Sequence, residues 1–334
     1  MLAEAQETIP RGEGWVYEPK WDGFRAIVFR DEGSVRLSSR NSQPLERYFP
    51  EVVEGLKAVL PPRCVLDGEL VIPGPRGLDF EALQNRIHPA ASRVTMLSTK
   101  TPAGFTAFDA LALGDVDLRP EPFSARRRVL LEVLPASTLY FPTPQTSSAD
   151  EAQRWFEEFE GAGCDGLIAR RLELPYAPGK RVMVKVKHHR TADVVVGGFR
   201  EGKAPGSVGA LLLGVYDDDG VFHHLGHTSS FKAKEKVELF EQLKPMVIER
   251  SFTGRAPDVK SRWSQGHDSS WTAITPTLVC EVRYDSMLGP RFRHASTFLR
   301  WRLDKSPQQC TFGQMLPPRP FSLERIVALA RASG

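Results

Sequence analysis

A lysine follows Tyr17-Glu18-Pro19 and lies directly before a predicted Asp22-Gly23 turn. An amine becomes a nucleophile only in its neutral form, which nearby cations or desolvation favour. The spacing Lys-x-Asp-Gly therefore makes Lys20 a candidate for covalent catalysis. Three fixed positions recur by chance in roughly one chain in twenty-five of this size. Since most turn lysines are merely solvated, this assignment depends on the rest of the chain.

Other polar motifs follow Lys20 in the sequence. They are Ser39-Arg40-Asn41, Leu66-Asp67-Gly68-Glu69-Leu70, Phe105-Thr106-Ala107-Phe108-Asp109, Asp165-Gly166-Leu167-Ile168, Lys185-Val186-Lys187 and Arg300-Trp301-Arg302-Leu303-Asp304-Lys305. Each motif alone has a structural explanation: an edge-strand acid, a core aromatic or a solvated cationic face. Taken singly, each motif favours that structural explanation; only their joint presence and order point to a common function.

In the first half of the chain, both strands and helices are predicted to position these residues. Alternation predicts strands over 24–30 and 35–39, joined by a turn at 31–33, and further strands over 64–73, 105–113 and 164–171. Helical spacing predicts helices over 45–60 and over 152–160, the second preceded by a capping box at 148–151. In the strand over 183–189, alternation places Lys185 and Lys187 on one face.

The second half changes to short strands, predicted over 194–199, 209–216, 222–227, 277–284 and 296–303, with one helix over 232–244. Five strands and one helix match a small, partly open barrel such as the OB-fold. We predict an α+β domain over 1–191 and an OB-fold domain over 192–334. The stretch 253–270, rich in Gly, Ser and Pro, is predicted to be a loop.

Composition is that of a globular protein, with 41% hydrophobic and 25% charged residues. Residues 193–334 carry 19 Lys and Arg against 15 Asp and Glu, a charge of +4 that suits contact with phosphates. The four cysteines form no CxxC pair, which argues against a zinc ribbon or a disulfide scaffold. No signal peptide or membrane-spanning run is predicted, so we expect a cytoplasmic, nucleoid-associated protein.

Jointly, these motifs resemble the covalent nucleotidyltransferase superfamily, specifically ATP-dependent DNA ligases of the bacterial ligase C and ligase D type. The strings YEPKWDGFRAIVFR, LDGELV, DGLIARR and FLRWRLDK carry the resemblance, which extends from Trp15 to Pro307. It implies a nucleotidyltransferase (adenylation) domain of antiparallel sheets and helices, followed by an OB-fold domain. The implied activity is sealing of 3′-hydroxyl/5′-phosphate nicks in duplex DNA, in DNA repair, by a monomer that acts with other repair proteins.

The resemblance also implies a role for each residue. Lys20 would carry AMP from ATP, and the main chain at Glu18 would lie beside the adenine edge. Phe108 and Ile168 would pack on the two faces of the base, and Glu69 would bind the ribose hydroxyls. Phosphate and ribose contacts fall to the cations Arg25, Arg40, Lys185 and Lys187. Asp22 and Asp165 would help to hold Mg²⁺ or Mn²⁺, and pyrophosphate would be oriented by Arg302, Asp304 and Lys305.

Two alternatives stay open at this point. An RNA ligase or an mRNA capping enzyme would use the same lysine chemistry, and a non-catalytic nucleic-acid-binding protein could share the fold. The sequence also departs from the family pattern, because position 165 is Asp where Glu is usual. The carboxylate is retained but is one methylene shorter, which weakens the metal assignment there.

Overall fold

The computed structural model describes residues 1–75, 77–257, 270–315 and 319–332, and it divides into two compact units. Unit 1 comprises Met1–His188 and Pro317–Gly334, and unit 2 comprises His189–Leu316. The predicted division assigned all of 192–334 to the second domain. The structure instead groups the end of the chain with unit 1, because a C-terminal helix packs into the core of that unit.

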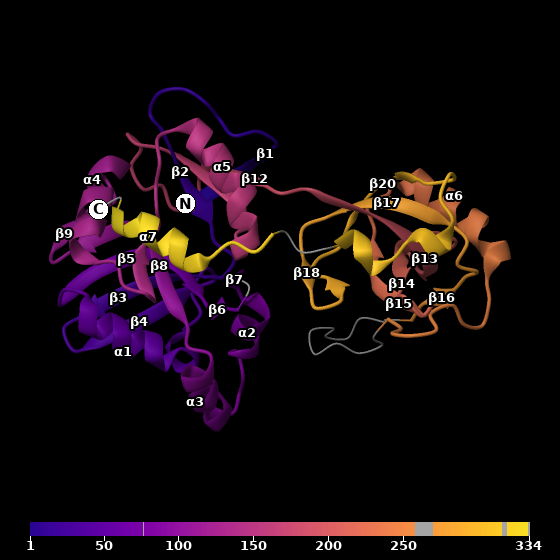
Figure 1. Cartoon of the computed structure of the whole chain (residues 1–334), viewed down its shortest axis with the longest axis horizontal. Helices are drawn as coiled ribbons and strands as arrows, with labels where there is room; N and C mark the ends of the chain where they lie inside the picture. The colour runs from indigo at the N-terminus through magenta and orange to yellow at the C-terminus, as the bar shows by residue number, and fades with distance from the viewer. Residues whose placement is uncertain (76, 258–269, 316–318, 333–334) are drawn as a thin grey trace. The chain divides into compact units, whose positions relative to one another are not determined.

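Unit 1 contains two large sheets and one two-stranded pair (Figure 1). The four-stranded sheet has the order β1-β12-β11-β2, with bounds Leu2–Gln6, Arg181–Lys187, Gly166–Arg171 and Trp15–Lys20. The six-stranded sheet has the order β10-β8-β5-β3-β4, with β9 paired to β8; the bounds are Tyr140–Pro142, Gly104–Leu113, Arg63–Val71, Phe24–Asp31, Ser34–Ser39 and Val116–Asp117. Short strands β6 (Pro73–Gly74) and β7 (Gly77–Leu78) pair with each other. The predicted hairpin over 24–39 is confirmed, with Glu32 in the left-handed region at φ 46°.

The helices of unit 1 fill the space around these sheets. They are α1 (Pro50–Val59), α2 (Phe80–Asn85), α3 (Ala91–Lys100), α4 (Phe123–Val133), α5 (Ala149–Phe159) and α7 (Leu323–Ala332). The helix predicted over 45–60 is broken: a 3-10 turn, η1, covers Glu46–Tyr48, and α1 begins at Pro50. Proline has no backbone N–H, so it fits the first helical position but not the interior. At α5 half of the predicted capping box forms, since the Ser148 side chain accepts from the Glu151 backbone N–H. The other half does not: the Ser148 backbone N–H donates to the Thr146 hydroxyl, which in turn donates to the Glu151 carboxylate.

Helix α7 completes the core of unit 1, in which it is drawn in yellow (Figure 1). Ile326, Val327 and Ala330 are buried, and they belong to a core cluster that includes Trp155 and Phe159. Burial of side chains as large as Ile326 and Val327 contributes about 1.5–3 kcal/mol each. The last helix is therefore part of the hydrophobic core around β2 and α5.

Unit 2 contains a sheet with the order β15-β14-β13-β17-β20, and β16 pairs with β13. The bounds are Phe222–Thr228, Val208–Tyr216, Arg190–Glu201, Val279–Tyr284, Thr297–Trp301 and Thr272–Ala273. Helix α6 (Ala233–Leu243) lies where a helix was predicted. Strands β18 (Met287–Leu288) and β19 (Arg291–Phe292) form a separate pair. A single bridge between Thr228 and Ser296 links the two edges, so the five-stranded, partly open barrel is confirmed.

No helix within the described ranges is long and apolar enough to span a membrane. The predicted loop over 253–270 lies largely outside the residues that the structure describes. All four cysteines are buried and unpaired.

Candidate active site

The register of the four-stranded sheet brings the predicted nucleophile and the predicted phosphate-binding lysines together. Ile168 on the central strand β11 pairs with Glu18 on one side and Lys185 on the other. Two positions along, Gly166 pairs with Lys20 and with Lys187. Side chains two residues apart point to the same face of a strand. One face of this sheet therefore carries two adjacent rows of predicted site residues.

Two glycines allow the backbone to approach closely beside Lys20. Gly166 has φ 138°, and a Cβ there would lie 2.0 Å from the Val186 carbonyl oxygen. A Cβ on Gly23 would lie 2.1 Å from the Leu70 carbonyl oxygen. Any larger residue would push the strands apart at the site. The glycines of Lys-x-Asp-Gly and Asp-Gly-Leu-Ile are thus required by packing around the lysine.

A pocket of about 310 Å³ opens beside Lys20, and both sheets of unit 1 contribute to it. Eight of the predicted site residues line it: Glu18, Lys20, Arg25, Arg40, Glu69, Phe108, Ile168 and Lys185. Its size lies at the lower end of the range of small-ligand pockets. The lining combines an aromatic ring, aliphatic side chains, cations and a carboxylate, which suits a nucleotide.

Lys20 forms an ion pair with Asp165, with 2.8 Å between Nζ and Oδ2. The same Asp165 oxygen lies 3.6 Å from Lys187 Nζ. Asp165 and Lys187 are outside the pocket lining, as is Asp22. Burial raises the pKa of the Cys164 thiol, and the negative charges of Asp165 and Asp22 add to this shift.

Burial raises the pKa of Glu69 to about 8, although the charges of Lys20 and Arg25 oppose this shift. Desolvation lowers the pKa of Lys185, and neighbouring cations, led by Lys187 and Lys20, lower it further. A concentration of positive charge of this kind attracts phosphate oxygens. The site therefore combines a cationic wall with one carboxyl group that is easily protonated.

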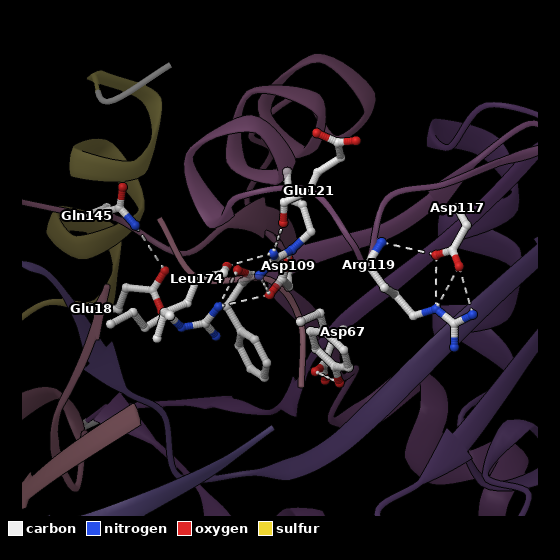
Figure 2. Close-up of polar contacts among 12 residues, drawn as sticks. Glu18, Asp67, Asp109, Asp117, Arg119, Glu121, Gln145 and Leu174 are labelled. Carbon is white, nitrogen blue, oxygen red and sulfur yellow. Dashed lines mark hydrogen bonds and ion pairs between the residues drawn. The ribbon is translucent and has the colours of Figure 1, made fainter. Parts of the chain in front are cut away.

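A buried network of ion pairs and hydrogen bonds holds the pocket residues Glu18 and Arg170 (Figure 2). Asp109 accepts bonds from Arg126, at 2.7 and 3.0 Å, and from Arg170, at 3.1 Å. Arg170 Nε lies 3.0 Å from Glu18 Oε2, an ion pair without the angle of a hydrogen bond. Gln145 donates to the other Glu18 oxygen at 3.3 Å. Buried charges are tolerated only when they are paired in this way, so the network fixes Glu18 at the pocket wall.

Two guanidinium groups lie close to the ring of Phe108. Arg170 is 5.2 Å and Arg25 is 5.7 Å from the ring centroid, measured from Cζ. Arg25 is itself held by a bidentate pair with buried Asp67, which also accepts a bond from Tyr176 at 2.8 Å. These contacts orient the ring at the pocket wall.

The three residues predicted to orient pyrophosphate all lie in unit 2, where they are bonded to one another or to a shared partner. Arg302 donates to Asp304 at 2.9 and 2.8 Å, and both Arg302 and Lys305 contact Asp193. The sequence reasoning missed Asp193. It also missed the pocket residues Met1, Leu2, Ala3, Pro19, Trp21, Arg170, Arg181 and Met183. For Arg181 and Met183 a signal existed, because they precede Lys185 at alternate positions of one strand.

Comparisons with known proteins agree with this geometry. Residues 1–187 match the family model described as "ATP dependent DNA ligase domain", and residues 204–305 match "ATP dependent DNA ligase C terminal region". The chain is 48% identical to DNA ligase C1 of Mycolicibacterium smegmatis, over 97% of this chain and 95% of that protein. It is 47% identical to DNA ligase C of Mycobacterium tuberculosis, over 98% and 96% of the two chains.

A more distant relative is the multifunctional non-homologous end joining protein LigD of Mycobacterium bovis, 32% identical over 88% of this chain and 37% of that protein. A solved structure of a Lig E DNA ligase is 21% identical, with a TM-score of 0.56 and coverage of 90% and 98%, and it shows a shared fold. The family matches span both units, and the relatives named ligase C cover almost the whole chain. This chain therefore belongs to the ATP-dependent DNA ligase family.

Proposed function

We propose that this ligase seals nicks in duplex DNA through an AMP adduct on Lys20. The observation that supports the proposal is the register of the four-stranded sheet: Lys20, which lines a nucleotide-sized pocket, is in the same row as Lys187 and next to the row that contains Lys185. Phosphoryl transfer needs positioning and stabilisation of charge more than covalent participation by many groups. A nucleophile beside a cationic wall meets both requirements.

In the first step, the neutral Lys20 amine attacks the α-phosphorus of ATP. A nitrogen–phosphorus bond forms, the bond from that phosphorus to the bridging oxygen breaks, and pyrophosphate leaves with the electron pair. The amine loses a proton, for which Asp165 is the nearest carboxylate at 2.8 Å. Lys185 lines the pocket and stabilises the negative charge that develops on the phosphoryl oxygens.

The base would occupy the pocket between Phe108 and Ile168, with its edge at the main chain of Glu18 and the ribose hydroxyls at Glu69. Arg25 and Arg40 contribute further positive charge to the same pocket. In the second step, a DNA 5′-phosphate oxygen attacks the AMP phosphorus and releases Lys20. In the third, the adjacent 3′-hydroxyl attacks the DNA phosphorus, forms the phosphodiester bond and releases AMP.

A divalent metal fits this site through water rather than as a protein-enclosed ion. The described residues contain no group of three or more His, Cys, Asp or Glu side chains placed to bind a metal. Mg²⁺ commonly uses one or two carboxylates together with waters and phosphate oxygens, and Asp22 and Asp165 would provide those carboxylates. When bound, the metal would neutralise phosphate charge. It would also compete with Lys20 for Asp165.

The test uses the whole chain, α-labelled ATP and Mg²⁺, followed by nicked duplex DNA. The wild type should form a labelled protein that loses its label when DNA is added, with formation of sealed strands. Lys20→Ala should form no adduct. An adduct on the Lys20→Ala protein would refute the role of Lys20, and transfer to RNA but not DNA would refute the substrate.

A further inference from the structure

The two cations assigned to pyrophosphate share one carboxylate in unit 2. Arg302 Nη1 lies 2.9 Å from both Asp193 oxygens, and Lys305 Nζ lies 2.8 Å from Oδ2. The Asp193 side chain is only 12% exposed, whereas Arg302 and Lys305 are 21% and 20% exposed. The Asp193 carboxylate is therefore more buried than the two cations that contact it.

Asp193 is itself fixed by residues far away in the sequence. It lies in β13, opposite Glu281 of β17. Its backbone N–H donates to Gln314 Oε1 at 2.9 Å, and its carbonyl accepts from Gln314 Nε2 at 3.1 Å. Arg302 is tied to the same sheet, because its backbone N–H donates to Val279 O at 2.9 Å. These backbone hydrogen bonds fix the position of the Asp193 carboxylate relative to Arg302.

The two cations differ in what they have left to donate. A guanidinium has five N–H donors on three nitrogens, and every nitrogen of Arg302 already donates to a carboxylate: Nη1 to Asp193, and Nε and Nη2 to Asp304. The N–H donors that remain on Arg302 are therefore held in the plane of a guanidinium that is fixed by these contacts. An ammonium has three N–H donors, and Lys305 uses one of them on Asp193. Within the described part of the chain, two donors of Lys305 have no protein acceptor. The two remaining donors of Lys305 lie on one ammonium nitrogen, so they can bind a phosphate oxygen without breaking its contact with Asp193.

We propose that Asp193 is a positioning residue for lysine adenylation, a role that rests on the proposed function. It holds the Lys305 ammonium for the leaving pyrophosphate, while Arg302, which contacts both Asp193 oxygens, keeps that carboxylate in place. A charge-assisted hydrogen bond needs a fixed donor to be effective in a transition state, and the Asp193 carboxylate supplies that constraint.

The experiment compares Asp193→Asn with Glu281→Gln as a matched control. Glu281 is opposite Asp193 in register and holds a different arginine, Arg300, at 2.6 Å. Two rates are measured in the full chain: formation of the AMP adduct from ATP, and sealing of nicked DNA that already carries AMP at its 5′ end. Asp193→Asn should slow adenylation roughly ten- to a hundredfold, as expected for loss of a charged hydrogen bond. Sealing should change less than threefold, and Glu281→Gln should change neither rate.

A double variant separates positioning from a general structural role. Because Asp193 acts through Lys305, Asp193→Asn combined with Lys305→Met should adenylate no more slowly than Lys305→Met alone. Asp193→Glu, which keeps the charge but moves the carboxylate by one methylene, provides a second test if the Asn variant is unstable; it should slow adenylation only.

Three results would overturn the proposal: multiplicative losses in the double variant, equal losses in adenylation and sealing, or adenylation that is unchanged or faster in Asp193→Asn. A wild-type protein that forms no AMP adduct would instead refute the proposed function.

Discussion

Replacing Phe108 with alanine should weaken ATP binding more than folding. The ring lies at the pocket wall and is only partly buried, whereas Phe105 of the same strand is 0% exposed in the core. Base–aromatic stacking contributes about 1–3 kcal/mol, so the dissociation constant for ATP should rise by roughly five- to 150-fold. Loss of the contacts with Arg25 and Arg170 should cost about 0.5–1 kcal/mol of stability each. Phe105→Ala should cost about 3–5 kcal/mol of stability.

Calorimetric titration with ATP gives the affinity, and urea unfolding gives the stability of each variant. Phe108→Leu keeps most of the apolar volume but removes the aromatic face, so it should retain stability and still lose affinity. If Phe108→Ala unfolds as easily as Phe105→Ala while it binds ATP like the wild type, the ring is a core residue and the stacking role is wrong.

Three further predictions address the rest of the site. Lys20→Arg keeps the charge but should form no AMP adduct in a gel assay with labelled ATP, because a guanidinium is not a nucleophile at neutral pH; a labelled band would contradict this. Glu69 binds more protons in the folded than in the unfolded chain between its ordinary pKa and about 8, so its contribution to stability falls as pH rises through that window. The melting temperature of the wild type should therefore decrease relative to Glu69→Gln between pH 6 and 8, and a constant difference would show that Glu69 is not perturbed. DNA binding should weaken steeply with salt and vary little among nicked duplexes of unrelated sequence, since phosphates carry no sequence information; strong preference for one sequence in a binding titration would argue against a general ligase.

The residues that could be predicted from the sequence are those whose role depends on a short motif. Lys20 and Phe108 each lie in a short motif, and the joint order of these motifs along the chain made both candidates; both line one pocket in the structure. Alternation along 183–189 was enough to put Lys185 and Lys187 on one face, and the sheet register confirms it. Local patterns suffice there because a strand fixes the direction of its own side chains.

The partners of those residues could not be predicted, because they come together only through packing. Arg170 looks like one more charge at a strand end, yet it is 4% exposed and joins Glu18 to Asp109. Asp193 precedes an apolar run and carries no motif of its own. No local pattern tells which buried charge pairs with which. The break before Pro50 differs, since proline chemistry alone could have placed the start of that helix.

The position of α7 has a consequence for how the protein is made. Unit 1 is discontinuous in sequence. The whole of unit 2 is therefore translated before Ile326, Val327 and Ala330 of α7, which pack with Trp155 and Phe159 in the core of unit 1. Domains commonly begin to fold during synthesis, in the order in which they emerge. We therefore expect unit 1 to expose the apolar surface that α7 covers until unit 2 has been synthesised. A nascent chain stalled before α7 should therefore have a folded barrel and an incomplete, aggregation-prone adenylation unit.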